Sequence, residues 1–525
     1  MMTESRTSWL RLLRERFRLI YLAPVLAFLA LSAWAFASPI GAGPDDDYHL
    51  VSIWCGGDGS EQCDAGSDET SRVLPSAFKN VACYAQDPAR SAACQDDVWS
   101  TWDGDPVELT RGNFGGEYPP VYYAVQNLFA TGDMQVGALA MRLFNAALFV
   151  GLATALFALL PAQRRTTLLW GWLVALVPLG MFLIPSNNPS GWALTGVGTA
   201  FLALLGWFET TGRRRWFLGV LYLVGVVMAA GARGDAAVYV IGATVTAIIL
   251  TWSPTRAWWR LSQLPILGII IAVIFFATAG QSGVGSVGFS GGGTATVPVP
   301  GDATGEEAPL GGISLAAYNL LMLPFLWTGV WGSWGLGWLD TQMPAFVPWA
   351  ATAAFVVVGF AGFGRLTSRK SLALGGVLLV MIVLPVYVLT VGGDKVGANL
   401  QPRYLLPLIV LFVFLLLVEP SRRPLRFTRP QTLVILGALV SANLISLQVN
   451  IRRYVTGADQ QGLNLDAGAE WWWDGLPVGP TMVWVLGAVG YAALVGVLST
   501  VLVAPRTAMT ADPSPTRSAA VDSLR

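Results

Sequence analysis

The sequence predicts an all-α integral membrane protein with about twelve transmembrane helices. Of its 525 residues, 54% are hydrophobic and only 12% are charged, whereas a soluble domain carries about 25% charged residues. Apolar runs of roughly 20 residues, the length that crosses a bilayer as a helix, recur along the chain. The formal net charge is zero, so nothing in the composition indicates binding to nucleic acid.

Twelve apolar runs define the predicted spans. They cover residues 19–38, 136–160, 168–185, 190–208, 216–232, 236–252, 263–279, 346–363, 371–391, 403–419, 431–449 and 481–503. The first run follows several arginines, as in a signal peptide, but it is long enough to span and is interpreted as a retained helix. The apolar stretch 313–339 is interrupted by Gly and Trp, so it is interpreted as interfacial or re-entrant.

The remaining segments complete the predicted organisation around a membrane domain at 19–503. They are a basic arm at 1–18, a large loop at 39–135, a Gly-rich flexible loop with an interfacial segment at 280–345, a last loop at 450–480 and a disordered tail at 504–525. The large loop is far longer than a connector requires, and long loops inside folded domains are usually functional or disordered. Its aromatic residues favour an ordered loop, with a surface helix opening at Pro119.

The charge distribution predicts the orientation in the membrane. With the N-terminus in the cytoplasm, the predicted cytoplasmic segments hold 22 of the 32 Lys and Arg residues but only 6 of the 32 acids. Because Lys and Arg favour the cytoplasmic side, both termini are expected there and the loop at 39–135 is expected outside. Composition further suggests the plasma membrane of a bacterium.

All four cysteines fall in the large loop, at Cys55, Cys63, Cys83 and Cys94. An even number of cysteines in an extracytoplasmic loop predicts two disulfides in an oxidising compartment. Three pairings are open, of which Cys55–Cys63 with Cys83–Cys94 is the most local. A metal site is disfavoured because no Cys-x-x-Cys pair occurs.

The densest charge cluster lies just after the first span. Asp45, Asp46 and Asp47 are followed by His49, the only histidine in the chain. Three adjacent carboxylates should raise the pKa of at least one of them, which suits a general base. We therefore expect an active site here. The other interpretations are a solvated acidic run or a Mg²⁺ or Ca²⁺ site at Asp45 and Asp46, since carboxylate oxygens suit hard cations.

Further polar residues are predicted on the same face of the membrane and are candidates for substrate binding. Together with Asp47 they are Glu117, Tyr118, Arg233, Asp235, Lys395, Arg403, Tyr404, Arg452 and Arg453. No soluble nucleotide-binding domain is present, so an enzyme acting on this face would need a donor carried by the membrane. Arginines suit a lipid phosphate, and a carboxylate suits deprotonation of a hydroxyl acceptor.

These motifs resemble the DUF2142 family of predicted membrane proteins, within the GT-C superfamily of glycosyltransferases. Pro44, Asp45, Asp46 and His49 match the family's Pro-Asp-Glu-x-x-His pattern, with Asp46 in place of Glu. Further matches, in the same order along the chain, are Asn188-Pro189, Arg233-Gly234-Asp235, Arg403-Tyr404-Leu405 with Pro407, and Arg452-Arg453-Tyr454 with Gly457. The resemblance extends over residues 39–457.

The resemblance implies a GT-C-like helical bundle and an inverting transfer of a sugar from a polyprenyl-phosphate donor to a cell-envelope glycan or glycolipid. Asp45 or Asp46 would deprotonate the acceptor hydroxyl, and His49 would orient a carboxylate, bind the acceptor or help to hold a metal. The departing lipid phosphate would be stabilised by Arg403, Arg233 or the pair Arg452 and Arg453. The sugar, the acceptor and the lipid length are not predicted.

Three other functions are consistent with the sequence. A transporter or flippase would place polar groups near mid-bilayer, often with internal repeats. A polymerase or ligase of lipid-linked glycans would use a similar active site. A non-catalytic assembly scaffold would tolerate neutralisation of Asp45, Asp46 and Arg403.

Overall fold

The computed structural model describes residues 19–57, 60–100, 102, 105–280, 310–364, 366–419, 425–473 and 475–503. The predictions for the basic arm at 1–18, for the tail at 504–525 and for most of the Gly-rich loop fall outside these residues.

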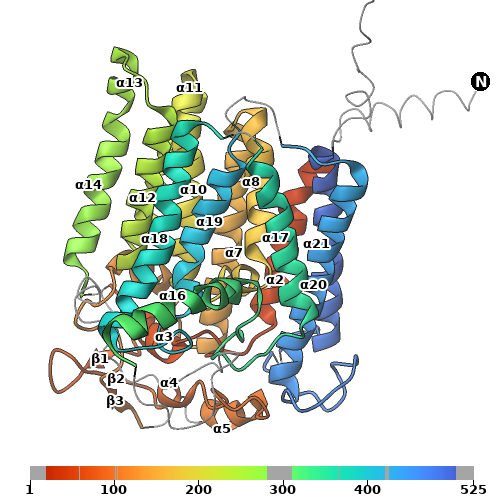
Figure 1. The fold of residues 1–525 in the computed structure, drawn as a ribbon. Coiled ribbons are helices and arrows are strands. Elements are labelled where there is room, and N and C mark those ends of the chain that lie inside the picture. The colour runs from red at the N-terminus through yellow and green to blue at the C-terminus, as the bar shows by residue number, and fades with distance from the viewer. Residues whose placement is uncertain are drawn as a thin grey trace, which may run out of the picture.

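The described chain forms a bundle of long, roughly parallel and antiparallel helices (Figure 1). Its helices are α2 (Ala23–Phe36), α7 (Met134–Leu159), α8 (Ala162–Leu176), α9 (Leu179–Leu183), α10 (Ser190–Glu209), α11 (Gly212–Ala230), α12 (Gly234–Thr251), α14 (Gln263–Thr278), α17 (Phe346–Gly362), α18 (Ser368–Gly392), α19 (Pro402–Leu417), α20 (Arg429–Val455) and α21 (Pro480–Leu502). Each predicted apolar run therefore contains a helix.

Fewer helices than the predicted twelve meet the requirements of a membrane span. Among the described residues, nine helices are long and apolar enough to cross a bilayer. The predicted spans at α8, α17 and α19 have only 15, 17 and 16 residues, or about 23–26 Å at 1.5 Å per residue. Helix α11 has three arginines in its first turn, which lower its hydropathy. The structure thus supports an all-helical membrane protein without supporting the count of twelve.

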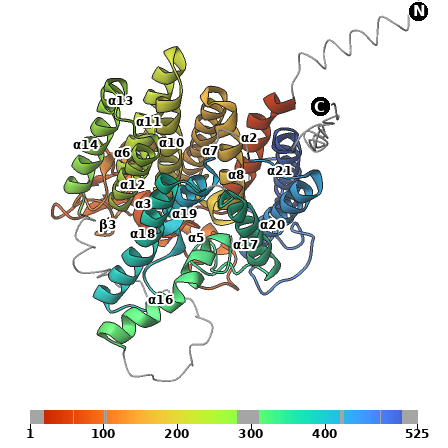
Figure 2. The same cartoon turned by 45° about the horizontal axis from the view of Figure 1, so that its top comes forward.

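One of these nine helices is α16 (Gly312–Thr328), which lies in the stretch interpreted as interfacial or re-entrant. Its length and composition would allow it to cross a bilayer. In Figures 1 and 2, however, it runs across the direction of the bundle and lies against α18.

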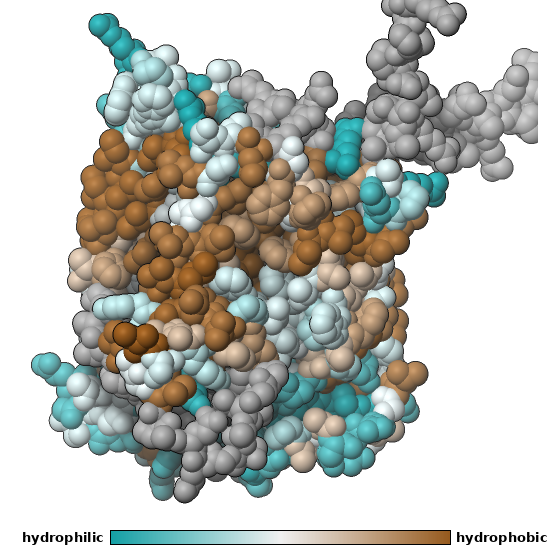
Figure 3. Space-filling view, viewed as in Figure 1, coloured by the Kyte–Doolittle hydropathy of each residue, from teal (hydrophilic) through white to brown (hydrophobic). Residues whose placement is uncertain are grey.

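The bundle has two polar ends separated by an apolar band, which Figure 3 shows in brown. The loop end carries the large loop between α2 and α7. The basic end carries the short connections before α8, α11 and α18, with Arg164, Arg215 and Arg369. Apolar surface between two charged ends is expected for a protein whose middle faces lipid.

Helix α10 is the centre of the bundle, because nearly all of its residues are buried. It packs closely against α11 through Gly196 and Gly225. A Cβ at Gly196 would lie 2.6 Å from the backbone of α11, so neither position has room for a larger residue. Small residues of this kind let helices approach within a membrane.

The described residues of the large loop contain their own secondary structure. Its elements are α3 (Asp46–Trp54), β1 (Asp64–Ala65), β2 (Arg72–Leu74), α4 (Ala77–Asn80), α5 (Gln95–Trp99), β3 (Val107–Leu109) and α6 (Pro120–Asn127). The strands form an antiparallel sheet in the order β1-β2-β3, with Val73 opposite Glu108. The disulfides join Cys55 to Cys63 and Cys83 to Cys94, the most local of the three pairings. The helix expected at Pro119 is α6, for which Pro119 is the N-cap residue.

Candidate functional site

The end of α2 is fixed in place by Arg142 of α7, which is 3% exposed. Its guanidinium donates hydrogen bonds to the carbonyl oxygens of Ala35, Ser38 and Pro39 and to Oδ1 of Asn187. A buried arginine needs such partners to offset its desolvation. Arg142 thereby sets the direction in which the chain leaves α2 towards the acidic cluster.

Asp45 lies at a sharp turn that opens α3. Its φ of 59° is in the left-handed region, which Asp tolerates better than most residues. The turn is held by the Gly43 N–H, which donates to Oδ2 of Asp46 at 2.9 Å. Pro44 O accepts from Nδ2 of Asn188 at 2.7 Å and from Arg403 at 3.1 Å. The acidic first turn also suits the positive end of the helix dipole.

The Asp45 carboxylate lies between two arginines from distant parts of the chain. Nη2 of Arg403 donates to its Oδ2 at 2.5 Å, and Nη2 of Arg111 lies 3.3 Å from its Oδ1. The Asp45 side chain is 35% exposed, while that of Arg403 is 3% exposed. Burial alone would raise the pKa of Asp45, but the charge of Arg403, with other nearby cations, lowers it to about 2. Asp45 is therefore an ionised carboxylate that solvent can reach.

Asp46, the next residue, differs from Asp45 both in its exposure and in the direction of its pKa shift. The residue is fully buried, and burial raises its pKa to about 6 despite the opposing charge of Arg142. Its Oδ1 has no hydrogen-bond partner among the described residues. Asp46 supports the turn from inside and is enclosed in this conformation, whereas Asp45 faces outward.

His49 is also buried, and burial lowers its pKa to about 3, so the ring is neutral at physiological pH. Its Nδ1 lies 2.9 Å from the hydroxyl of Tyr123 on α6. The rings of Tyr48 and Tyr118 pack against it at about equal distance, with centroids 5.4 Å away. These contacts make His49 one of the links between α3 and α6, beside Asn127, which donates to the carbonyl oxygen of Ile53.

A second guanidinium, that of Arg233, extends the site towards α12. Its Cζ lies 4.7 Å from the ring centroid of Tyr404 and 5.5 Å from that of Tyr118. Its Nε and Nη2 donate to the two oxygens of Asp235, both at 2.9 Å. Arg403 contacts the same Tyr404 ring at 4.9 Å. Two buried arginines therefore flank one tyrosine beside Asp45.

The outer rim of the site consists of Arg111, Asp47 and Glu117. Arg111 is 55% exposed and bonds Asp47 at 2.5 Å, while the Tyr48 hydroxyl donates to Glu117 at 3.2 Å. Arg111 was not a candidate from sequence; a basic residue within a mainly acidic loop was the only available signal. Asn188 was noted only as part of a family motif, and neither it nor Arg142 was a candidate site residue, since nothing local shows which buried polar groups hold the turn at Asp45.

Three candidate residues have partners elsewhere. Arg452 donates to the carbonyl oxygens of Gly462 and Asn464. Arg453 forms a buried ion pair with Asp340 at 2.8 Å. Lys395 lies over the ring of Tyr318, 5.1 Å from its centroid. These contacts give both arginines structural roles, Arg452 in the last loop and Arg453 in a buried ion pair between α20 and the segment that precedes α17.

The residues at Asp45 do not fit a divalent cation. Both oxygens of Asp45 already contact guanidinium groups, and Asp46 is enclosed. The described part of the chain contains no cluster of three His, Cys, Asp or Glu residues suited to a metal ion. The arrangement instead suits an anionic ligand that would exchange places with a carboxylate on the arginines.

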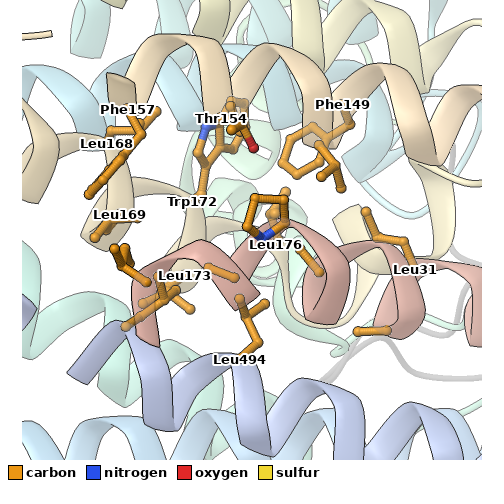
Figure 4. A pocket seen from close by; sticks show the side chains of 18 of the residues that line it. Leu31, Phe149, Thr154, Phe157, Leu168, Leu169, Trp172, Leu173, Leu176 and Leu494 are labelled. Carbon is orange, nitrogen blue, oxygen red and sulfur yellow. The ribbon is translucent and has the colours of Figure 1, made fainter. Parts of the chain in front are cut away.

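The site has little preformed volume. A hollow of about 20 Å³ adjoins Pro44 and Arg403. A much larger cavity, of about 430 Å³, lies between α2, α7, α8 and α21, where apolar side chains such as Leu31, Phe149 and Trp172 surround it (Figure 4). That cavity is in the half of the bundle near the basic end, so it does not contain the acidic cluster.

Comparison with known proteins identifies a family for this chain. The family described as "Predicted membrane protein (DUF2142)" matches residues 28–412, which include Asp45, Arg233 and Arg403. No curated protein and no solved structure matches the chain. Because the family match covers most of the sequence, the chain belongs to the DUF2142 family of predicted membrane proteins.

Proposed function

We propose that this protein is a membrane glycosyltransferase that transfers a sugar from a polyprenyl-phosphate donor to a cell-envelope glycan or glycolipid. The observation that carries the proposal is the solvent-accessible, ionised Asp45 beside two buried arginines, Arg403 and Arg233, at one end of a helical membrane bundle. A carboxylate that accepts a proton and cations that bind a phosphate are the two groups such a reaction needs.

In the proposed reaction, the acceptor hydroxyl attacks the anomeric carbon and Asp45 takes the hydroxyl proton. The bond between the anomeric carbon and the phosphate oxygen breaks, and its electrons leave with the polyprenyl phosphate. Arg403 and Arg233 stabilise the charge on that leaving group. Attack from the face opposite the leaving group inverts the anomeric configuration.

The low pKa of Asp45 has a specific consequence for this mechanism. With its pKa near 2, the carboxylate is too weak a base for efficient proton transfer at neutral pH. Binding of a donor phosphate to Arg403 would withdraw that arginine from Asp45 and raise the carboxylate pKa. The donor would thus activate the base, and acceptor deprotonation would follow donor binding.

The sidedness of the molecule agrees with an extracytoplasmic reaction. The acidic cluster and both disulfides lie at the loop end, whereas the basic connections lie at the other end. By the positive-inside rule, the loop end faces outward and the termini are cytoplasmic, as expected in a bacterial plasma membrane with about twelve spans. Disulfides persist on that side.

The test is sugar transfer in membranes that contain equal amounts of wild type or variant, with a panel of polyprenyl-phosphate sugars and cell-envelope extract. Asp45→Asn should lower transfer by about 10²–10⁴-fold, the usual contribution of a general base. Asp46→Asn should keep most activity, because Asp46 is enclosed. Asp97→Asn, in an exposed acid of the same loop, is the matched control.

The proposal fails if wild type consumes no donor and Asp45→Asn still restores the envelope of a deletion strain, as a transporter or scaffold would. Loss of transfer in Asp46→Asn with a fully active Asp45→Asn would reassign the base. Transfer of a whole glycan in place of one sugar would identify a polymerase or ligase.

A further inference from the structure

A second polar cavity lies at the basic end, far from Asp45 along the bundle. Its volume is about 790 Å³, within the range of ligand pockets. The ends of α8, α10, α12, α18 and α19 and the short helix α13 (Arg256–Leu261) enclose it. Arg164, Arg215 and Arg369 line it together with several hydroxyl side chains and the acid Glu209.

The cavity carries an excess of positive charge. Arg164 is paired with Glu209 at 2.6 Å, so the charges of Arg215 and Arg369 are not balanced by a lining carboxylate. Each of these two arginines also caps a helix end: Nε of Arg215 donates to Thr210 O and Nη1 of Arg369 donates to Trp252 O, both at 2.7 Å. A guanidinium has five donor hydrogens, so this capping leaves further donors for an anion.

The N-terminus of α18 adds to this field. Thr367 caps the 25-residue helix, and Ser368 and Arg369 in its first turn line the cavity. The partial positive charge of a helix N-terminus and its free N–H groups favour phosphate. Arginine side chains and a helix N-terminus thus act on the same space.

The surroundings indicate the depth of the cavity in a membrane. Trp216, Trp252 and Trp259, on the neighbouring helix ends, are 70%, 44% and 61% exposed. Exposed tryptophans concentrate at the level of lipid headgroups. Leu205 and Leu250 also line the cavity, so it combines apolar and cationic surface at that level.

We infer that this cavity binds the phosphate headgroup of an anionic lipid, in the leaflet opposite the one that faces the Asp45 site. Arg215 and Arg369 bind the phosphate, and the apolar lining contacts the glycerol and the first carbons of the chains. The site is independent of the proposed transfer reaction, because no residue of the acidic cluster takes part in it.

The experiment measures the melting temperature of the purified full-length protein in neutral detergent against added phosphatidylglycerol, phosphatidylcholine or inorganic phosphate. Wild type should show a saturable rise with phosphatidylglycerol only. The Arg215→Gln/Arg369→Gln double variant should need at least about tenfold more of this lipid, because charge-assisted hydrogen bonds are lost. Arg213→Gln/Arg214→Gln, on exposed arginines of the same helix, should respond like wild type.

For each variant, the rise in melting temperature with added lipid is measured relative to the same variant without lipid. This comparison separates lipid binding from any stability lost with the helix caps. A lower starting temperature with an unchanged response to phosphatidylglycerol would overturn the proposal and assign the arginines to capping alone. An equal rise with phosphatidylcholine would overturn it as well. An equal rise with inorganic phosphate would overturn the lipid assignment in favour of a soluble anion.

Discussion

Two clusters at the loop end contain the same three residue types but differ in exposure. In one, Arg403 lies 4.9 Å from the ring of its neighbour Tyr404 and pairs with Asp45. In the other, Arg453 lies 5.0 Å from the ring of Tyr454 and pairs with Asp340. The arginine is buried in both, but the side chain of Asp45 is 35% exposed and that of Asp340 only 5% exposed.

The surroundings explain the difference. Arg453 also donates to the carbonyl oxygens of Tyr84 and Arg90, which both lie in the segment between Cys83 and Cys94. Arg453 therefore fastens the disulfide-bonded loop to α20, and its guanidinium has protein partners without any ligand. At Asp45 the second cation is Arg111, whose side chain is 55% exposed to solvent. An Arg–Asp ion pair is thus a structural link where both side chains are buried, as in Arg453–Asp340. It is a candidate site where the carboxylate faces solvent, as in Arg403–Asp45.

The largest effect on stability is expected at the fully buried ion pair between Arg453 and Asp340. Asp340→Asn should lower the free energy of unfolding by about 3–5 kcal/mol, because it leaves Arg453 buried without a counter-charge. Asp45→Asn should cost about 1 kcal/mol, since that pair is partly solvated. Thermal unfolding in detergent measures both values. Equal losses would remove the distinction between the two clusters.

A second comparison is between neighbours in sequence, Asp45 and Asp46. The pKa of Asp46 is raised from 3.8 to about 6, so the folded state holds a proton more tightly than the unfolded chain. The free energy of unfolding should therefore decrease as pH rises from about 4 to 6. The decrease should be about 3 kcal/mol, because each pKa unit corresponds to about 1.4 kcal/mol. Asp46→Asn should be at least as stable as wild type at pH 7, with the gain disappearing by pH 4. A destabilised variant at pH 7 would show that the ionised carboxylate is needed for the turn.

The pH response of His49 should have the opposite sign. Its pKa falls from 6.5 to about 3 on folding, so the unfolded chain binds a proton first as pH decreases. Stability should drop by about 2 kcal/mol between pH 6.5 and 5. In His49→Gln that part of the drop should vanish. Unfolding curves of both proteins at these two pH values are the measurement, and parallel curves would contradict a buried neutral histidine.

The smallest effect is expected at the exposed cation of the site. Arg111→Gln should change stability by less than about 1 kcal/mol, because its ion pairs with Asp45 and Asp47 are solvated. If Asp45 is the base, the variant should also shift the acid limb of the transfer rate to higher pH, since one cation that lowers the Asp45 pKa is gone. A large loss of stability would mean that Arg111 is a structural link like Arg453.

Much of the fold and part of the site follow from local sequence. Helices occur in all twelve apolar runs because hydropathy is a sum over about 20 neighbouring residues and requires no tertiary information. The disulfide pairing also followed the shortest separations, 8 and 11 residues. Short motifs were sufficient to place the acidic cluster, Arg233 and Arg403 among the candidates and to indicate the family.

Only the tertiary structure decided which candidates meet. Asp45 and Arg403 are 358 positions apart, so their ion pair depends on how α3 and α19 are packed. The turn at Asp45 directs one carboxylate to solvent and its neighbour into the core, although the two residues are chemically identical in sequence. Arg403 and Arg453 likewise occur in the same Arg-Tyr pattern. Burial and ion pairing are properties of contacts between distant segments, and for that reason only the folded chain separates the site from the structural link.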